Sequence, residues 1–480
     1  MQDPLFLLFI GILVVVGGII GLRLHAFLAL LLGAFIVSLM TPDAAIELYG
    51  LSSGMSEKAA QSLANQAVGA RIAAAFGSTC GKIGILIAMA AIIGKCMLES
   101  GAAERIVRST LKVTGEKRAP ISFLGSSFFL AIPVFFDTVF YLMIPLAKAM
   151  AMRLGKNYLL LVLAIAAGAA MANSLVPPTP GPLFLIVEMN IPIGLMMIGG
   201  FLVGLVTIVT GYLFAAWANK KWPIPLRDSL DAPLAEIKKL TQKTDAELPA
   251  LGFSLLPILL PVGFISADAA FSAFYQGTAG SSNLILDYLI KFIHFFGEKN
   301  LALIVGAFSA ILLLVYQKKN DEAALIKSVQ AALMSAGVII LITAAGGAFG
   351  AMLQQTGISA RIAELTKGYQ MALIPLAFLI TAVVRTAQGS ATVAMITASG
   401  ILAGMATTVN LEYHQLYIGL AIACGSKLIP WMNDSGFWIV CKMSNLTEKE
   451  ALKTFSPMLT IMGITGLLVV LLAAKLFPLV

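Results

Sequence analysis

The stretch Asn173-Ser-Leu-Val-Pro-Pro-Thr-Pro-Gly-Pro182 interrupts an apolar run that extends from Tyr158 to Ile186. A regular helix cannot continue through it, because each proline lacks a backbone N–H and clashes with the preceding turn. In a lipid bilayer, irregular backbone is tolerated only where protein buries it or a watery cavity hydrates it. The run therefore predicts a transmembrane helix over about 158–186 that is broken in its middle, where a binding site can form.

The composition of the whole chain places it in a membrane. Of its 480 residues, 59% are hydrophobic and only 12% are charged, whereas soluble domains carry about 25% charged residues. At about 20 residues a span, the chain has room for roughly ten to fourteen crossings. The net charge of +8 is interpreted as a guide to orientation in the membrane, and nucleic acid is not expected as a partner. The four cysteines form no CxxC pair, so no metal site and no cofactor are expected.

Three further apolar runs are broken in the same way. The ranges are about 121–147, broken at 131–138; about 371–406, broken at 385–392; and about 415–441, broken at 430–436. Basic clusters flank the 121–147 run at both ends, and lysine and arginine favour the cytoplasmic side. This run is therefore predicted to enter and leave by the cytoplasmic face as a re-entrant hairpin. Counting the crossings makes 371–406 a second hairpin that enters from outside.

An internal repeat supports this arrangement. Gly101, followed by Arg105, recurs as Gly357, followed by Arg361, 256 residues later, and Ala164-Ile-Ala-x-Gly168 recurs 257 residues later as Ala421-Ile-Ala-x-Gly425. We expect a first repeat over 1–218, a cytoplasmic linker over 219–249 and a second repeat over 250–480. The hairpins enter from opposite faces, so the repeats are inverted, as in many secondary transporters. The predicted fold is an all-α polytopic membrane protein whose two inverted-topology repeats each contain a re-entrant hairpin and a broken transmembrane helix.

Equivalent breaks of inverted repeats meet near the middle of the membrane, where the N-termini of half-helices present free N–H groups to an anion. A carboxylate substrate is the natural interpretation. Four ionisable residues lie within the apolar runs, at a cost of about 2.5–3.5 kcal/mol each unless they are paired or hydrated. Arg385 can hold a carboxylate with two parallel bonds, and a partly desolvated Asp137 or Asp434 can take up and release a proton. Alternatively, Arg385 or Lys427 only neutralises an aspartate.

The candidate residues follow from the four breaks. Those expected to bind substrate are Ser174, Thr179, Gly181, Arg385, Gly389, Ser390, Thr392, Asn433, Asp434 and Ser435; those expected to carry the proton are Asp137 and Asp434; Pro133 and Thr138 mark the tip of the first hairpin; and Lys427 is a possible ion-pair partner. Three of the breaks also have a simpler interpretation. The range 389–392 suits a contact between helices, 433–436 suits an ordinary turn, and the proline cluster suits an external loop.

Three stretches resemble the signature regions of a known family. They are Ser174–Pro182, Arg385-(x3)-Gly-Ser-Ala-Thr-Val-Ala394, and Asn433-Asp-Ser-Gly-Phe-Trp438, and they are similar to those of the gluconate permeases, the GntP-type gluconate:proton symporters. The resemblance implies a proton-coupled importer of gluconate, a related sugar acid or a hydroxycarboxylate, with an elevator-type fold of the ion-transporter superfamily. It also implies a homodimer in the inner membrane of a bacterial-type cell. Gluconate carriers tend to have a glutamate at the first hairpin tip and a histidine in the proline motif, where this chain has Asp137 and Thr179.

Three other functions compete with this one. A sodium-coupled carrier of a carboxylate or of D-serine is the nearest alternative, because hydroxyls and unwound carbonyls also suit a sodium ion. An enzyme is not expected, since the three histidines are far apart and form no HExxH motif. A passive channel explains two inverted hairpins less well than alternating access does.

Overall fold

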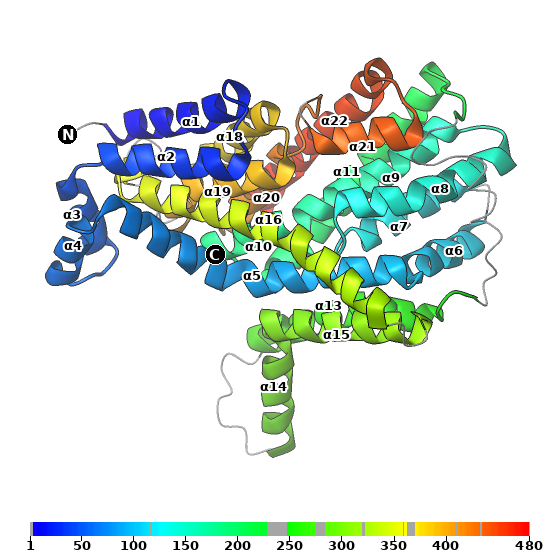
Figure 1. Ribbon diagram of the computed structural model, residues 1–480, viewed down its shortest axis with the longest axis horizontal. Helices are drawn as coiled ribbons and strands as arrows, with labels where there is room; N and C mark the ends of the chain where they lie inside the picture. Colours follow the sequence, from blue (N-terminus) through cyan, green and yellow to red (C-terminus); the bar gives the residue numbers. More distant parts are fainter. Residues whose placement is uncertain are drawn as a thin grey trace.

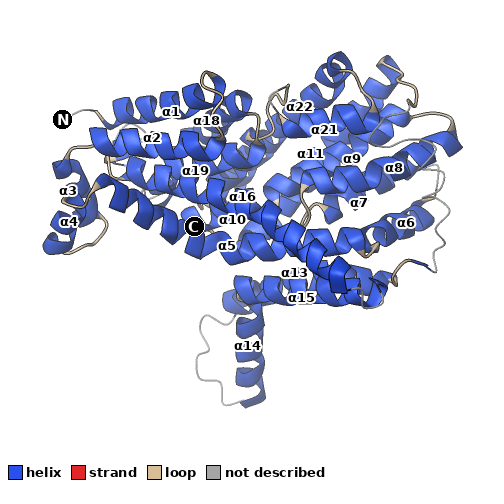
Figure 2. Cartoon of the chain, viewed as in Figure 1, coloured by secondary structure: helices blue, strands red, loops and turns tan. Residues whose placement is uncertain are grey.

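The computed structural model describes residues 3–115, 118–227, 247–274, 284–318, 322–358, 360–361, 370–408, 411–432 and 434–479. Within these ranges the chain consists of helices and their connections, without strands (Figure 2). Seven of the described helical segments are long and apolar enough to cross a membrane, and α2 with α3, bent by 101°, is a possible eighth span. Several of the remaining apolar helices are shorter, with 10–17 residues.

The helices of the first half are α1 (Pro4–Ile20), α2 (Ala26–Met40), α3 (Asp43–Ser52), α4 (Glu57–Ala64), α5 (Val68–Glu99), α6 (Ala102–Thr114), α7 (Ala119–Leu130), α8 (Phe136–Leu154), α9 (Tyr158–Leu175), α10 (Pro180–Glu188) and α11 (Ile193–Lys221). Those of the second half are α13 (Leu251–Phe274), α14 (Leu284–Gly297), α15 (Lys299–Lys318), α16 (Glu322–Gln354), α18 (Leu373–Gln388), α19 (Ala391–Thr408), α20 (Leu416–Gly425), α21 (Ser435–Ser444) and α22 (Glu448–Leu476). Most run along the long axis of the molecule, whereas α14 projects across it (Figure 1).

The order of helices in the second half repeats that of the first. Helices α5, α7, α8, α9, α10 and α11 begin 254 to 258 residues before α16, α18, α19, α20, α21 and α22, respectively. Gly101 and Gly357 both have left-handed backbone, with φ of +79° and +80°, which glycine adopts without steric cost. The assignment of these halves to inverted repeats stays a prediction.

The glycines of the second repeated motif let buried helices approach their neighbours. A Cβ atom on Gly168 in α9 would overlap the Leu124 carbonyl oxygen of α7 and lie 2.9 Å from the Phe128 nitrogen. A Cβ atom on Gly425, at the end of α20, would overlap the Phe378 carbonyl oxygen of α18. In both halves, therefore, the helix before a break packs directly on the backbone of another helix: α9 on α7, and α20 on α18.

Each of the four breaks separates two helices. Residues 131–135 separate α7 from α8, and residues 176–179 separate α9 from α10. Gly389, at φ +81°, ends α18 shortly before α19 begins. The longest break, residues 426–434, separates α20 from α21.

Candidate functional site

A cavity of about 410 Å³ opens where three of these breaks meet. Its volume suits a small organic molecule. The residues that line it are Phe135, Phe136, Asp137, Thr138, Tyr141, Ala170, Asn173, Ser335, Ile339, Arg385, Ser390, Ala391, Thr392, Lys427, Asp434, Ser435, Gly436, Phe455 and Leu459. The cavity therefore joins residues from both halves of the chain.

Three helices begin at this cavity, so their N-termini face it. The first turn of α8 contributes residues 136–138, that of α19 contributes Ala391 and Thr392, and that of α21 contributes Ser435 and Gly436. The first four N–H groups of a helix lack partners within the helix, and the helix dipole places partial positive charge there. Such a convergence favours an anion.

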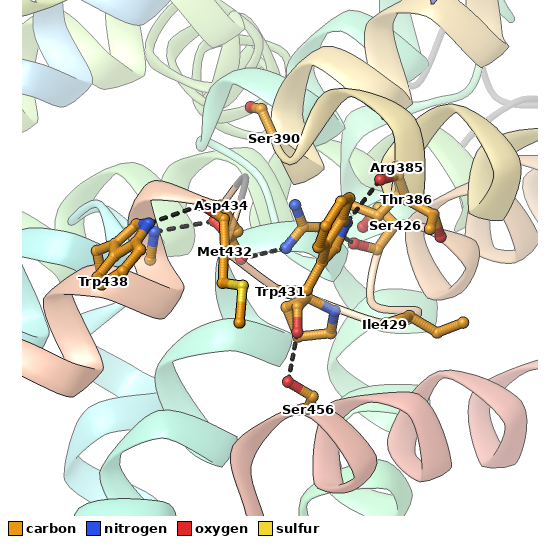
Figure 3. A network of polar contacts seen from close by, with 12 residues as sticks. Arg385, Thr386, Ser390, Ser426, Ile429, Trp431, Met432, Asp434, Trp438 and Ser456 are labelled. Atoms are coloured by element: carbon orange, nitrogen blue, oxygen red, sulfur yellow. Dashed lines mark hydrogen bonds and ion pairs between the residues drawn. The ribbon is translucent and has the colours of Figure 1, made fainter. Parts of the chain in front are cut away.

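Arg385 and Asp434 form a buried ion pair beside these N-termini. Nη2 of Arg385 donates to Oδ2 of Asp434, and Nε donates to the Ser426 carbonyl oxygen at 3.0 Å (Figure 3). The other carboxylate oxygen of Asp434 accepts from the Gly436 nitrogen at 2.9 Å and caps α21. Arg385 thus neutralises an aspartate, one of the alternatives left open by the sequence. Its Nη1 is buried with no hydrogen-bond partner among the described residues, so it can also donate to a ligand.

Side chains satisfy the unwound backbone between α20 and α21. Trp438 Nε1 donates to the Met432 carbonyl oxygen at 2.6 Å, and Ser456 Oγ donates to the Pro430 carbonyl oxygen (Figure 3). The Ile429 nitrogen donates to Thr460 Oγ1 at 3.0 Å. Trp431 Nε1 caps α18 by donating to the Thr386 carbonyl oxygen at 2.8 Å. Irregular backbone at membrane depth needs hydrogen-bond partners for its polar groups. These bonds provide such partners and so stabilise the conformation of the break.

The other charged residues of the cavity are Asp137 and Lys427. Asp137 lies in the first turn of α8, and the nearby carboxylate of Asp434 acts on it electrostatically. Lys427 is only 4% exposed and follows the end of α20. Within the described part of the chain, neither side chain forms a hydrogen bond or an ion pair.

Several predicted site residues lie outside the lining. Ser174 is fully buried, with its Oγ 3.4 Å from Ser426 Oγ. Thr179 donates to the carbonyl oxygens of Asn173, at 2.8 Å, and Val176, at 3.1 Å, and so stabilises its own break. Gly181 packs against Met395. Pro133 and Gly389 belong to breaks that reach the cavity through their neighbours, and Asn433 lies outside the described residues.

Asn173 is a lining residue that was not singled out from the sequence. Its Oδ1 is buried without a hydrogen-bond partner among the described residues, so a ligand with a donor group suits it. The feature of the sequence that could have identified Asn173 is its side-chain amide, one helical turn before the proline cluster. Ser335 and Ile339 lie on the unbroken helix α16, where no local feature of the sequence marks them.

Comparisons with known proteins agree with the membrane architecture. The chain is 31% identical to an uncharacterized permease of Haemophilus influenzae, over 98% of this chain and 92% of the relative. It is 30% identical to a gluconate permease of Pseudomonas aeruginosa, over 98% of each. The crystal structure of the YdaH transporter of Alcanivorax borkumensis has a similar fold, with a TM-score of 0.57 at 13% identity, over 85% of this chain and 88% of that one.

The profile of the GntP family permeases matches residues 3–476, which is nearly the full length. Permeases of this kind act on a small molecule within a lipid bilayer, and they are transporters rather than enzymes. The chain therefore belongs to the GntP permease family and is a multi-pass membrane permease.

Proposed function

We propose that this permease is a secondary active importer of gluconate, or of a related sugar acid or hydroxycarboxylate, coupled to protons in the cytoplasmic membrane. The observation that carries the proposal is the convergence of three helix N-termini with Arg385 and Lys427 on one cavity. Helix N-termini and cationic side chains that meet in this way suit a carboxylate. The gluconate permease of Pseudomonas aeruginosa, similar along its whole length, supports the choice of substrate.

The polar groups that line the cavity suit a substrate with hydroxyl groups. The carboxylate faces the helix N-termini and the free Nη1 of Arg385, and the hydroxyls of the substrate donate to Asn173 Oδ1. Thr138, Ser390, Thr392 and Ser435 add hydroxyl groups that can both donate and accept. A carboxylate without hydroxyls would leave Asn173 Oδ1 unpaired, at a cost of about 1–3 kcal/mol.

Transport is proposed to follow alternating access of the elevator type. The two inverted repeats, 1–218 and 250–480, each supply a hairpin and a broken helix to the cavity, and the linker 219–249 joins them on the cytoplasmic side. The matching order of helices in the two halves supports this division. A homodimer is part of the same proposal.

Proton coupling is assigned to Asp137 rather than to Asp434. Asp434 is held by Arg385 and by the Gly436 nitrogen, so protonating it would break a buried pair. Asp137 has no such partner among the described residues. A sodium-coupled carrier of a carboxylate or of D-serine is the second candidate. It is less favoured because the carbonyls of Ser426, Pro430 and Met432 already accept hydrogen bonds.

Uptake into proteoliposomes tests the proposal. Labelled gluconate should accumulate when the lumen is made alkaline in sodium-free buffer, and a protonophore should release it. Accumulation that requires sodium would favour the second candidate, and equilibration without accumulation under either gradient would overturn active transport.

A further inference from the structure

The charged side chains of the cavity bear on how many protons accompany each carboxylate during transport. Four described lining residues have side chains that can carry a full charge: Asp137, Arg385, Lys427 and Asp434. Arg385 and Asp434 are paired, so their charges cancel locally. Lys427 and Asp137 are the two lining charges without an ion-pair partner in the described part of the chain.

The base of the Lys427 side chain lies against α22. The residue lies two positions after Gly425 at the end of α20, and its Cβ contacts α22, where an added Cβ on Gly463 would be 3.4 Å away. The side chain is almost fully buried, yet it lines the cavity. Burying an ammonium without an anionic partner is costly. Because Asp434 already forms an ion pair with Arg385, an anion bound in the cavity is the partner that suits Lys427.

We propose that Lys427 is the counter-ion of the transported carboxylate, and that Asp137 takes up one proton for each monocarboxylate, so that loading leaves the net charge of the cavity at zero. This inference rests on the proposed function. With all four side chains ionised the cavity is neutral, and a carboxylate alone would make it negative. A proton from the outer solution, bound to a carboxylate oxygen of Asp137 and later released inside, restores neutrality.

The surroundings of Asp137 agree with this count. The ionisable groups that share the cavity with it are Tyr141 on α8, Arg385 on α18, Lys427 after α20 and Asp434 at the start of α21. Residues from α9, α16, α19 and α22 add no charge. Carrying an unbalanced charge through a bilayer costs several kcal/mol, so the neutral loaded state is favoured. A dicarboxylate would leave one negative charge and should be a poor substrate.

The role of Lys427 is tested by comparing gluconate with gluconamide, which has the same hydroxyls but no charge. In the purified wild type, gluconate should bind more tightly. Lys427→Gln should reduce that preference by about ten- to hundredfold, the range for a hydrogen bond to a charged group, whereas Lys427→Arg should keep most of it. Lys442→Gln, at an exposed position on α21, is the matched control, and thermal unfolding shows whether each variant is folded.

The binding results distinguish a failure of the proposed function from a failure of the role of Lys427 alone. If the wild type binds both compounds equally, carboxylate recognition fails, and the proposed function fails with it. If the wild type prefers gluconate and folded Lys427→Gln keeps the full preference, Lys427 is not the counter-ion, although the transport proposal stands.

The stoichiometry is tested in proteoliposomes at a fixed pH gradient. Accumulation of gluconate at equilibrium should not change when a membrane potential is imposed. Transfer of one uncompensated charge would change accumulation about tenfold for every 60 mV or so, and that result would overturn the one-to-one ratio. Accumulation that ignores the pH gradient would instead refute proton coupling itself.

Discussion

Arg385 has two roles that mutation can separate. Nε and Nη2 hold the Ser426 carbonyl and the Asp434 carboxylate, whereas Nη1 has no partner in the described structure and is offered to the substrate. Removing one member of a buried ion pair typically costs about 3–5 kcal/mol. Arg385→Gln and Asp434→Asn should therefore each destabilise the protein strongly. The double variant should recover much of that loss, because two neutral amides can bond to each other without a buried charge.

Substrate binding should behave differently from stability. The double variant lacks Nη1, so gluconate binding should stay weaker by about 1.5–3 kcal/mol, the value of a charge-assisted hydrogen bond, or roughly ten- to hundredfold in Kd. Arg385→Lys should fall in the same range, because one ammonium cannot replace the planar fork.

The assay combines thermal unfolding in detergent with calorimetric titration of gluconate for the wild type, both single variants and the double variant. Recovery of stability without recovery of binding is the expected result. If binding recovers together with stability, Arg385 is only a neutraliser and the anchoring role is refuted. If the effects of the single changes on stability simply add, the two side chains are not coupled.

Three further predictions concern coupling and packing. Asp137→Asn, which mimics the protonated state, should abolish accumulation against a gradient in proteoliposomes but keep exchange of labelled for unlabelled gluconate; accumulation at the wild-type level would reject Asp137 as the carrier of the proton. Gly168→Ala should lower thermal stability by about 1–3 kcal/mol through overpacking against the Leu124 carbonyl, whereas Gly125→Ala, with no atom within 4 Å of its added Cβ, should not, and equal effects would refute the close packing. Trp431→Phe removes the hydrogen bond from Nε1 to the Thr386 carbonyl oxygen and should cost about 0.5–1.5 kcal/mol, measured as a lower unfolding temperature; an unchanged temperature would show that this bond does not stabilise the break.

The positions of the breaks could be predicted because their cause is local. Pro177 and Pro178 cannot continue a helix, and α9 ends at Leu175 just before them. Pro180 and Pro182 lie in the first turn of α10, where proline is tolerated. Gly389 adopts the left-handed backbone that glycine tolerates best. The charged residues of the cavity could be named for a similar reason, since an ionisable side chain inside an apolar run is costly unless it has a function.

The partners of those residues could not be predicted in the same way. Arg385 and Lys427 carry the same charge, and the sequence does not show which of them reaches Asp434, 49 residues after Arg385. The choice depends on how the break at 426–434 folds. The hydrogen bonds of Thr179 could not be predicted either: its hydroxyl, a candidate for substrate binding, donates to two carbonyls of its own break, as threonines in turns often do.

The convergence of three helix N-termini on one carboxylate site is the central claim, and cysteine protection tests it most directly. Thr138, Ser390 and Ser435 represent α8, α19 and α21, and each is changed singly to cysteine in a background that lacks the four native cysteines. Gluconate should protect all three from a small charged thiol reagent, with the same half-protecting concentration, and should not protect a cysteine at the exposed Ser53. Protection at only one of the three positions, or at clearly different concentrations, would contradict a single site formed by the three N-termini.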